Sequence, residues 1–484
     1  MIRPSMIHPT HRALVSKGQR KLTPTRGWTW PLAACAVLIF LGACLASPVS
    51  AQVPRVYGQG AAASGMGNAF AAQADNPSAI HYNPAGMTQL RGIQTMGGGT
   101  FVGGTTTFTS PSGGSVTGDH DGAFAWPGPG HGYITANLHG IGVAALEKLT
   151  VGIGITTPFG SIMRWPDNSP FRGITTFTAL PLFDIKPTFA YQLHPDFSIG
   201  AGADIYTFAS FFGEGHAELQ SVSPGGGLAP AGSKLEFHGK GTAPGFNIGA
   251  LYTALRNQDG RPIANLAVVY RSQATLHLDG GLLVNGAKLQ DATTTFVLPQ
   301  VITGGIALWP IRDAEREWKL ELNVDYVGWK SVGNFDIRLA NGTVIPQPQD
   351  WRGTYAILAG TEYRWLTLDR LPGWEIAIRG GYTHQQSQVP DLTFTPGVPS
   401  VDLHVISAGV GLICQGNGTF LGLIPCGSFG VGPVKTKLVG LDIFYQAFLY
   451  EPRTISGNTG LRATVNGLYD TTLHAGGFSI RASF

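Results

Sequence analysis

The sequence predicts an all-β protein: a transmembrane antiparallel β-barrel of about 14 strands with an N-terminal plug (hatch) of short helices inside the lumen. Three observations support this fold class. Charged residues make up 13% of the 484-residue chain and glycine occurs 68 times, which suits sheets whose outer face does not meet water. Beyond residue 51, polar and apolar residues alternate as they do along strands. The same region has no run of about 18 apolar residues, the length that a membrane-spanning helix needs.

Residues 1–51 are predicted to be a signal peptide. Six basic residues and no acidic residue precede a short apolar core at Leu32–Ala46, and Val-Ser-Ala at residues 49–51 is a small-x-small cleavage pattern. Two alternatives are open: Cys44 ends a lipoprotein-like Leu-Gly-Ala-Cys sequence and would then be lipidated, and Met6 is a second candidate start. Without the leader the chain has 26 basic and 29 acidic residues, so it has no basic excess for binding nucleic acid.

Alternation of polar and apolar residues defines the predicted strands. Val151, Ile153 and Ile155 share one face, while glycine and threonine occupy the other. Residues 266–279 are predicted as one strand, with Leu266, Val268 and Tyr270 outward and Arg271, Gln273, Thr275, His277 and Asp279 inward. A soluble secreted sandwich is the alternative, because its strands also alternate.

The connections and the chain end favour the outer membrane. Short polar turns alternate with long connections at 110–131, 213–240 and 335–351, as they do in outer-membrane barrels. The last strand ends on Phe484, and a terminal aromatic residue resembles the signal that the outer-membrane barrel assembly machinery reads. Residues 92–484 are therefore assigned to the barrel.

Residues 52–91 do not alternate and are predicted to form the plug. Asn76–Pro77 and Asn83–Pro84 each look like a helix cap followed by the first helical residue, which predicts two helices of one or two turns. So short a segment cannot form a core by itself, and we expect it to pack inside the lumen. The alternative is a disordered lead-in, but the segment has few charges and many apolar residues, which argues against disorder.

Two cysteines, Cys414 and Cys426, remain after the leader. They bracket a glycine-rich stretch of an exported chain, where disulfides persist, so we predict a disulfide that staples a loop. A metal site at these cysteines would need further ligands nearby, and the sequence supplies none there. No metal and no cofactor is predicted.

The stretch Ala63–Met87, ASGMGNAFAAQADNPSAIHYNPAGM, resembles the N-terminal plug of the outer-membrane long-chain fatty acid transporter family (FadL/TodX type). Asn83, Pro84, Ala85 and Gly86 match the family's Asn-Pro-Ala-Gly tetrad. Further segments such as VVYRSQATLHLDG, LELNVDYVGWKSVGNFDI and WRGTYAILAGTEYRW fall in the family's order, so the resemblance covers nearly all of the mature chain. The long leader and the cysteine-bracketed insert depart from the pattern.

The resemblance implies a monomeric barrel that lets hydrophobic molecules pass from outside, through a pocket, and sideways into the membrane. The side exit lies at a kink in the third strand, which here maps to Thr157, Pro158, Phe159 and Gly160. The residues agree with a kink, because Pro158 has no N–H for the ladder and Gly160 permits a bulge. The alternative is that Pro158 only ends the strand at the extracellular rim.

The function predicted is passive uptake of hydrophobic small molecules, either long-chain fatty acids or aromatic or aliphatic hydrocarbons, across an outer membrane of lipid and lipopolysaccharide. The inward charges Lys186, Arg271, Arg364 and Arg379 have two interpretations. They hold a ligand carboxylate, or they pair with Asp184, Asp325, Glu362 and Asp442 across strands. The competing functions are an open hydrophilic porin and a lipase-like enzyme, but the chain has no Gly-x-Ser-x-Gly or His-Glu-x-x-His motif.

Overall fold

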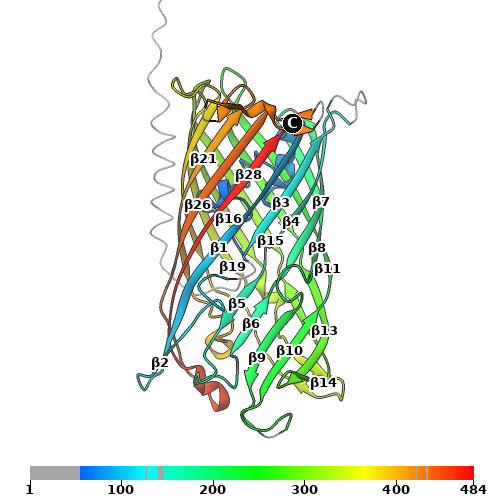
Figure 1. Cartoon of the computed structure of the whole chain (residues 1–484), viewed down its shortest axis with the longest axis vertical. Helices are drawn as coiled ribbons and strands as arrows, with labels where there is room; N and C mark the ends of the chain where they lie inside the picture. The colour runs from blue at the N-terminus through cyan, green and yellow to red at the C-terminus, as the bar shows by residue number, and fades with distance from the viewer. Residues whose placement is uncertain (1–54, 126–127, 140–145, 226, 421, 432–433) are drawn as a thin grey trace, which may run out of the picture.

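The wall of the molecule is one antiparallel sheet that closes on itself (Figure 1). The computed structural model describes residues 55–125, 128–139, 146–225, 227–420, 422–431 and 434–484, so the predicted signal peptide, with Cys44 and Met6, lies outside the described residues. Fourteen strands form the wall in chain order. They are β1 (Ile93–Thr109), β3 (Gly130–Asn137), β4 (Leu149–Thr156), β7 (Phe183–His194), β8 (Phe197–Thr207), β11 (Ala243–Arg256), β12 (Pro262–Arg271), β15 (Val301–Arg312), β16 (Arg316–Val327), β19 (Thr354–Trp365), β20 (Trp374–Gln385), β21 (Leu403–Gln415), β26 (Leu438–Tyr450) and β28 (Gly467–Ser483).

The first and last strands close the barrel. β1 pairs with β28 from Gln94–Ser483 to Thr109–Leu468, and the backbone N–H of Phe484 donates a 2.8 Å hydrogen bond to the carbonyl oxygen of Ile93. Two short strands extend the rim, β2 (Ser115–Gly118) on β1 and β27 (Arg453–Ile455) on β28. The predicted fold class, a closed antiparallel barrel of 14 strands, is confirmed.

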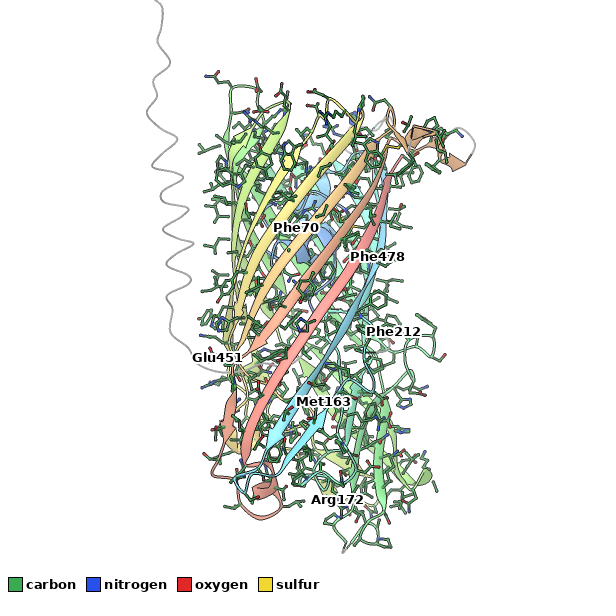
Figure 2. All side chains as sticks on the ribbon, turned by 60° about the vertical axis from the view of Figure 1, so that its left-hand side comes forward. Phe70, Met163, Arg172, Phe212, Glu451 and Phe478 are labelled. Atoms are coloured by element: carbon green, nitrogen blue, oxygen red, sulfur yellow. A yellow bond between two sulfur atoms is a disulfide. The ribbon has the colours of Figure 1, made fainter. Side chains whose placement is uncertain are left out.

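The outer face of the wall is apolar and the inner face is polar. On β4, Val151, Ile153 and Ile155 are exposed, whereas Thr150 and Thr156 are buried. Exposed apolar side chains recur around the wall and include Ile134, Phe189, Ile199, Ile248, Leu266, Val268, Ile306, Val324, Ile378, Val410, Ile443 and, on β28 (Figure 2), Phe478. This is the arrangement of a barrel whose outside meets lipid, and it explains the alternation in the sequence.

A second antiparallel sheet, here called the cap sheet, lies at the long-loop end of the barrel (Figure 1). The long connections between wall strands form it, among them the stretches 213–240 and 335–351, which the sequence indicated to be loops. Its strands are, in sheet order, β18 (Val344–Ile345), β17 (Ile337–Leu339), β14 (Ala287–Leu298), β13 (Ala274–Val284), β10 (Lys234–Lys240), β9 (Ala217–Val222), β6 (Phe177–Leu180) and β5 (Ser161–Arg164). Trp165, Phe237, Leu276 and Leu278 belong to the apolar core at this end.

The prediction of one strand over residues 266–279 is wrong. β12 ends at Arg271, and β13 begins at Ala274 in the cap sheet. Ser272 leaves the ladder and bonds Phe246 of β11 twice, through its backbone N–H and through its hydroxyl oxygen. This break reverses the faces: Leu276 and Leu278 are buried, while Gln273, His277 and Asp279 are exposed. Alternation in the sequence continues through the break, so it did not reveal the change of sheet.

The connection between β21 and β26 lies at the short-turn end, which is the periplasmic end in barrels of this kind. A disulfide joins Cys414 of β21 to Cys426, and both residues are buried. The connection is unusually long for this end of a barrel, and it folds locally. It contains β22 (Thr419–Phe420), β23 (Ile424–Pro425), η4 (Cys426–Ser428), β24 (Gly430–Val431) and β25 (Val434–Lys435).

In the part of the chain that the structure describes, helical structure is limited to short segments. The plug contains α2 (Ala61–Gly65), α3 (Ala79–Tyr82) and the 3₁₀ turn η1 (Pro84–Gln89), and the loops contain η2 (Trp329–Ser331), η3 (Asp391–Thr393) and η5 (Gly460–Val465). Within the described ranges, no helix has the length and apolar character needed to cross a membrane.

Candidate functional site

The plug, defined from here on as residues 55–91, lies inside the barrel, where Figure 2 labels its Phe70. The two Asn-Pro pairs act as local folding signals. Asn83 caps η1, because its Oδ1 accepts a 3.1 Å hydrogen bond from the backbone N–H of Ala85 while Pro84 takes the first helical position. Asn76 accepts a 3.0 Å bond from the backbone N–H of Ser78, and α3 begins only at Ala79. The first pair therefore forms a turn that leads into the helix.

The Asn-Pro-Ala-Gly tetrad fits closely against both the plug and the wall. The amide of Asn83 donates hydrogen bonds to the carbonyl oxygens of Ala71 in the plug, at 2.8 Å, and of Ala250 in β11, at 3.2 Å. A Cβ on Gly86 would overlap Ala74, and one on Gly249 of the wall would overlap the Asn83 side chain. Glycine at both positions therefore permits the close approach.

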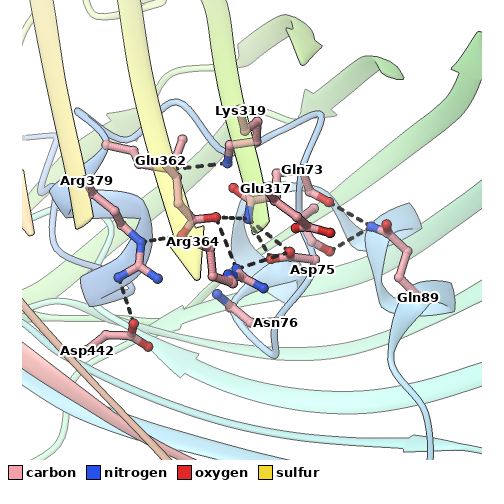
Figure 3. A network of polar contacts seen from close by, with 12 residues as sticks. Gln73, Asp75, Asn76, Gln89, Glu317, Lys319, Glu362, Arg364, Arg379 and Asp442 are labelled. Carbon is pink, nitrogen blue, oxygen red and sulfur yellow. Dashed lines mark hydrogen bonds and ion pairs between the residues drawn. The ribbon is translucent and has the colours of Figure 1, made fainter. Parts of the chain in front are cut away.

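A network of buried charges fastens the plug to the wall (Figure 3). Arg379 donates a 2.6 Å hydrogen bond to Glu362 and a 2.8 Å bond to Asp442. Arg364 contacts Glu362 at 3.1 Å and Asp75 of the plug at 3.9 Å. All five residues lie on inward-facing positions or in the plug, so their charges compensate one another inside the lumen.

The other two predicted lumen cations are also partnered. Lys186 is fully buried and forms ion pairs with Asp184 and Asp204. Arg271 donates a 3.0 Å hydrogen bond to the carbonyl oxygen of His81 in the plug. The structure therefore places Lys186, Arg271, Arg364 and Arg379 in a polar frame that supports the lumen. None of the four lines the apolar cavity described below, although Arg271 lines a smaller cavity that adjoins it.

The segment Thr157–Gly160 follows the end of β4 and turns away from the wall ladder. The backbone N–H of Thr157 donates a 2.9 Å hydrogen bond to Oε1 of Gln59 in the plug, and Nε2 of Gln59 donates a 3.0 Å bond to the carbonyl oxygen of Thr157. Phe159 forms an isolated β-bridge with Arg55. The plug therefore holds this segment by contacts that a neighbouring strand normally supplies.

An apolar cavity of about 210 Å³ lies between the plug and this segment. Its described lining includes Val56 and Tyr57 of the plug and Thr157, Phe159 and Gly160 after β4. The remaining lining residues come mainly from β1, from β26 and β28 and from the cap side, and include Val102, Met163, Leu180, Leu182, Phe212, Phe448 and Leu473. The cavity has the mostly apolar lining of a small-molecule binding site.

Sequence reasoning missed two contributors to this site. Gln59 is a buried glutamine in a small-residue run, and its partner Thr157 lies 98 positions away. Arg55 forms an ion pair with Asp325, which is 270 positions away and was expected to pair with a wall cation. Neither contact can be recognised from a single sequence. The one available hint is that a polar residue in an otherwise apolar plug needs a hydrogen-bonding partner.

Comparison with known proteins agrees with this geometry. A family profile described as "Outer membrane protein transport protein (OMPP1/FadL/TodX)" matches residues 42–419. No curated protein matches the sequence significantly. Among solved structures, a FadL homologue of Pseudomonas aeruginosa has a TM-score of 0.67 and 16% identity, covering 90% of this chain and 100% of its own.

Two structures of toluene transporters are also similar. TbuX of Ralstonia pickettii has a TM-score of 0.56 and 16% identity, covering 88% of this chain and 98% of its own. TodX of Pseudomonas putida has a TM-score of 0.57 and 15% identity, covering 88% and 99%. At these identities the structures establish the shared fold, while the family profile spans most of the chain and describes transport proteins, not enzymes. The chain therefore belongs to the OMPP1/FadL/TodX family of outer-membrane transport proteins.

Proposed function

We propose that this protein carries hydrophobic small molecules passively across the outer membrane, through the lumenal cavity and then sideways through the wall beside β4. One observation carries the proposal. The apolar cavity is bounded on one side by Val56 and Tyr57 of the plug and on another by Thr157–Gly160, the segment that leaves the wall. A solute in the cavity is thus in contact with both the plug and the interrupted part of the wall.

The pairing of β1 supports a lateral route. β1 pairs with β3 only from Ile93–Ala136 to Gly99–Gly130, and beyond this point it continues along β28. β4 likewise ends at Thr156. Beyond Gly99 this edge of β1 makes two backbone hydrogen bonds to the loop, at Thr100 and Val102, before β2 pairs with its end. A closure of this kind is weaker than a continuous ladder between two wall strands.

The chemistry of the cavity favours a neutral hydrocarbon, aromatic or aliphatic, over a long-chain fatty acid. Among the described lining residues, Arg55 is the one arginine or lysine, and it is paired with Asp325. A carboxylate in the cavity would have to displace Asp325, and that would leave a buried carboxylate unpaired. TbuX and TodX are toluene transporters, which supports the same substrate class.

The plug argues against an open hydrophilic porin. Apolar side chains of the plug, among them Met66, Phe70 and Ile80, are fully buried inside the lumen. A water-filled pore would need a continuous polar lumen, and here the lumen is filled with packed apolar residues and paired charges.

Uptake by a bacterial host that lacks a transporter of this family tests the proposal, with labelled toluene and labelled oleate as substrates. We expect toluene uptake that depends on the protein and little uptake of oleate. A variant in which Thr157–Gly160 is replaced by a regular strand sequence should lose toluene uptake, and a matched replacement of the exposed turn at residues 111–114 should keep it. Unchanged toluene uptake in the first variant would rule out the lateral exit, and equal uptake of oleate would rule out the neutral substrate class.

A further inference from the structure

Two histidines and two glutamates gather on one face of the cap sheet, away from the cavity. His216 directly precedes β9, so it lies on the same face as Glu218, two residues along the chain. The register of β10 against β9 pairs His238 with Glu218 and Glu236 with Gln220. All four side chains therefore project to one side, while Ala217 and Phe237 on the opposite face belong to the apolar core.

The nitrogen and oxygen atoms of this cluster are spaced as metal ligands are. Nε2 of His238 lies 3.4 Å from Oε1 of Glu218 and 3.4 Å from Oε2 of Glu236. Two ligand atoms bound tetrahedrally to zinc, each at 2.0–2.1 Å, are about 3.4 Å apart. One ligand atom from each of His216, Glu218 and His238 lies within 4.8 Å of the others.

The histidines carry unused nitrogen atoms. Nε2 of His216 and Nε2 of His238 are both buried, and neither makes a hydrogen bond to any described residue. The two rings stack with centroids 4.4 Å apart.

The cluster is partly open to solvent. In the sheet, Glu218 lies beside Ala179 of β6 and accepts a hydrogen bond from Nε2 of Gln220, and the Lys288 side chain lies over Gly281 beside His238. The side chains of His238, Glu218 and Glu236 keep 30%, 9% and 11% exposure, so an ion can reach them from solvent. Lys234 contacts the other oxygen of Glu236 at 2.6 Å and orients that carboxylate.

We propose that His216, Glu218 and His238 bind a divalent transition metal ion, with Glu236 or water as the fourth ligand, and that Zn²⁺ is the ion that this donor set fits best. Two imidazoles and a carboxylate are common zinc ligands. The ion ties the turn before β9 to β10 and so stabilises the cap sheet. This site lies outside the cavity and is independent of the transport route proposed above.

Metal binding to the full chain, purified in detergent and stripped with a chelator, tests the site. Titration with Zn²⁺ followed by calorimetry should give one strong site per chain, and Co²⁺ should give visible absorption bands of a low-symmetry site. His216→Ala and His238→Ala should each weaken Zn²⁺ binding at least about tenfold, because even changes behind the ligands cost 10–100-fold. His277→Ala is the matched control, since His277 is an exposed histidine of the same sheet.

A second variant tests the site even if a histidine substitution disturbs the folding of the cap sheet. Glu218→Gln keeps the shape and the cross-strand position of the side chain but weakens it as a metal ligand, and it should also lower the affinity for Zn²⁺. Strand content from circular dichroism should be the same for all variants. The site is ruled out if the natural chain binds no Zn²⁺, or if the His216→Ala/His238→Ala double variant binds it as strongly.

Discussion

The backbone N–H of Val56 donates a 3.0 Å hydrogen bond to the carbonyl oxygen of Pro158, which joins the plug to the segment that leaves the wall after β4. Beside it, Arg55 and Phe159 form a β-bridge. The plug thus supplies pairing that this segment lacks from the wall. Because the contact is shared, the lateral opening proposed beside β4 would require the plug to move or to release this segment.

Gln59→Leu should loosen this coupling. The leucine removes two hydrogen bonds to the backbone of Thr157, each with a net contribution of about 1 kcal/mol. The closed arrangement is thereby weakened, and we expect toluene uptake to rise severalfold in whole cells. Gln192→Leu, on a half-buried residue at the short-turn end, should leave uptake unchanged. Equal uptake by the two variants would show that Gln59 does not restrain the segment.

Gly86→Val should keep the plug from seating. A Cβ at this position overlaps Ala74, and overpacking of this kind typically costs about 1–3 kcal/mol. The wall should still assemble, so we expect a folded barrel with higher ion conductance in planar bilayers. Gly304→Val is the control, because nothing lies within 4 Å of a Cβ there. A conductance as low as that of the natural chain would contradict the role of Gly86.

Arg379→Met should destabilise the whole barrel. The substitution leaves Glu362 and Asp442 buried without the guanidinium that bridges them, and breaking one partner of a buried pair costs about 3–5 kcal/mol. Unfolding in guanidinium followed by tryptophan fluorescence measures the loss. Lys288→Ala removes an exposed pair with Asp291 and should change stability by less than about 1 kcal/mol. Similar values for the two variants would refute the importance of the buried network.

Cys414→Ser with Cys426→Ser should act locally. The disulfide joins two cysteines that are 12 positions apart in the connection at the short-turn end. The wall strands β21 and β26 pair through backbone hydrogen bonds that do not involve it. We expect faster proteolysis between residues 416 and 437, with unchanged toluene uptake. Resistance equal to that of the natural chain under a short protease pulse would show that other contacts hold the turn.

The local parts of the fold could be predicted from the sequence. Alternation gave the wall strands because the period of two separates a lipid-facing from a lumen-facing side. Asn83 and Pro84 marked the start of η1 because capping acts over two or three residues. The end of β4 was also visible at Pro158, since proline cannot donate to a ladder.

What depends on distant residues could not be predicted. The cap sheet combines strands from several connections, and the change of sheet at Ser272 does not interrupt the alternation. His216 directly precedes β9 and His238 lies on β10, so their proximity follows only from the register of these two strands. The partners of Gln59 and Arg55 were hidden for the same reason: each contact depends on where the plug lies in the closed barrel.

The closure of the barrel between β1 and β28 also constrains biosynthesis. The first wall strand gains its partner across the closure only when all 17 residues of β28, Gly467–Ser483, have been made. Until then β1 is an unpaired edge that can join the wrong strand, and pairing over so long a separation is slow. We therefore expect a chain without its last dozen residues to leave the barrel unclosed, because β1 then lacks much of its partner strand.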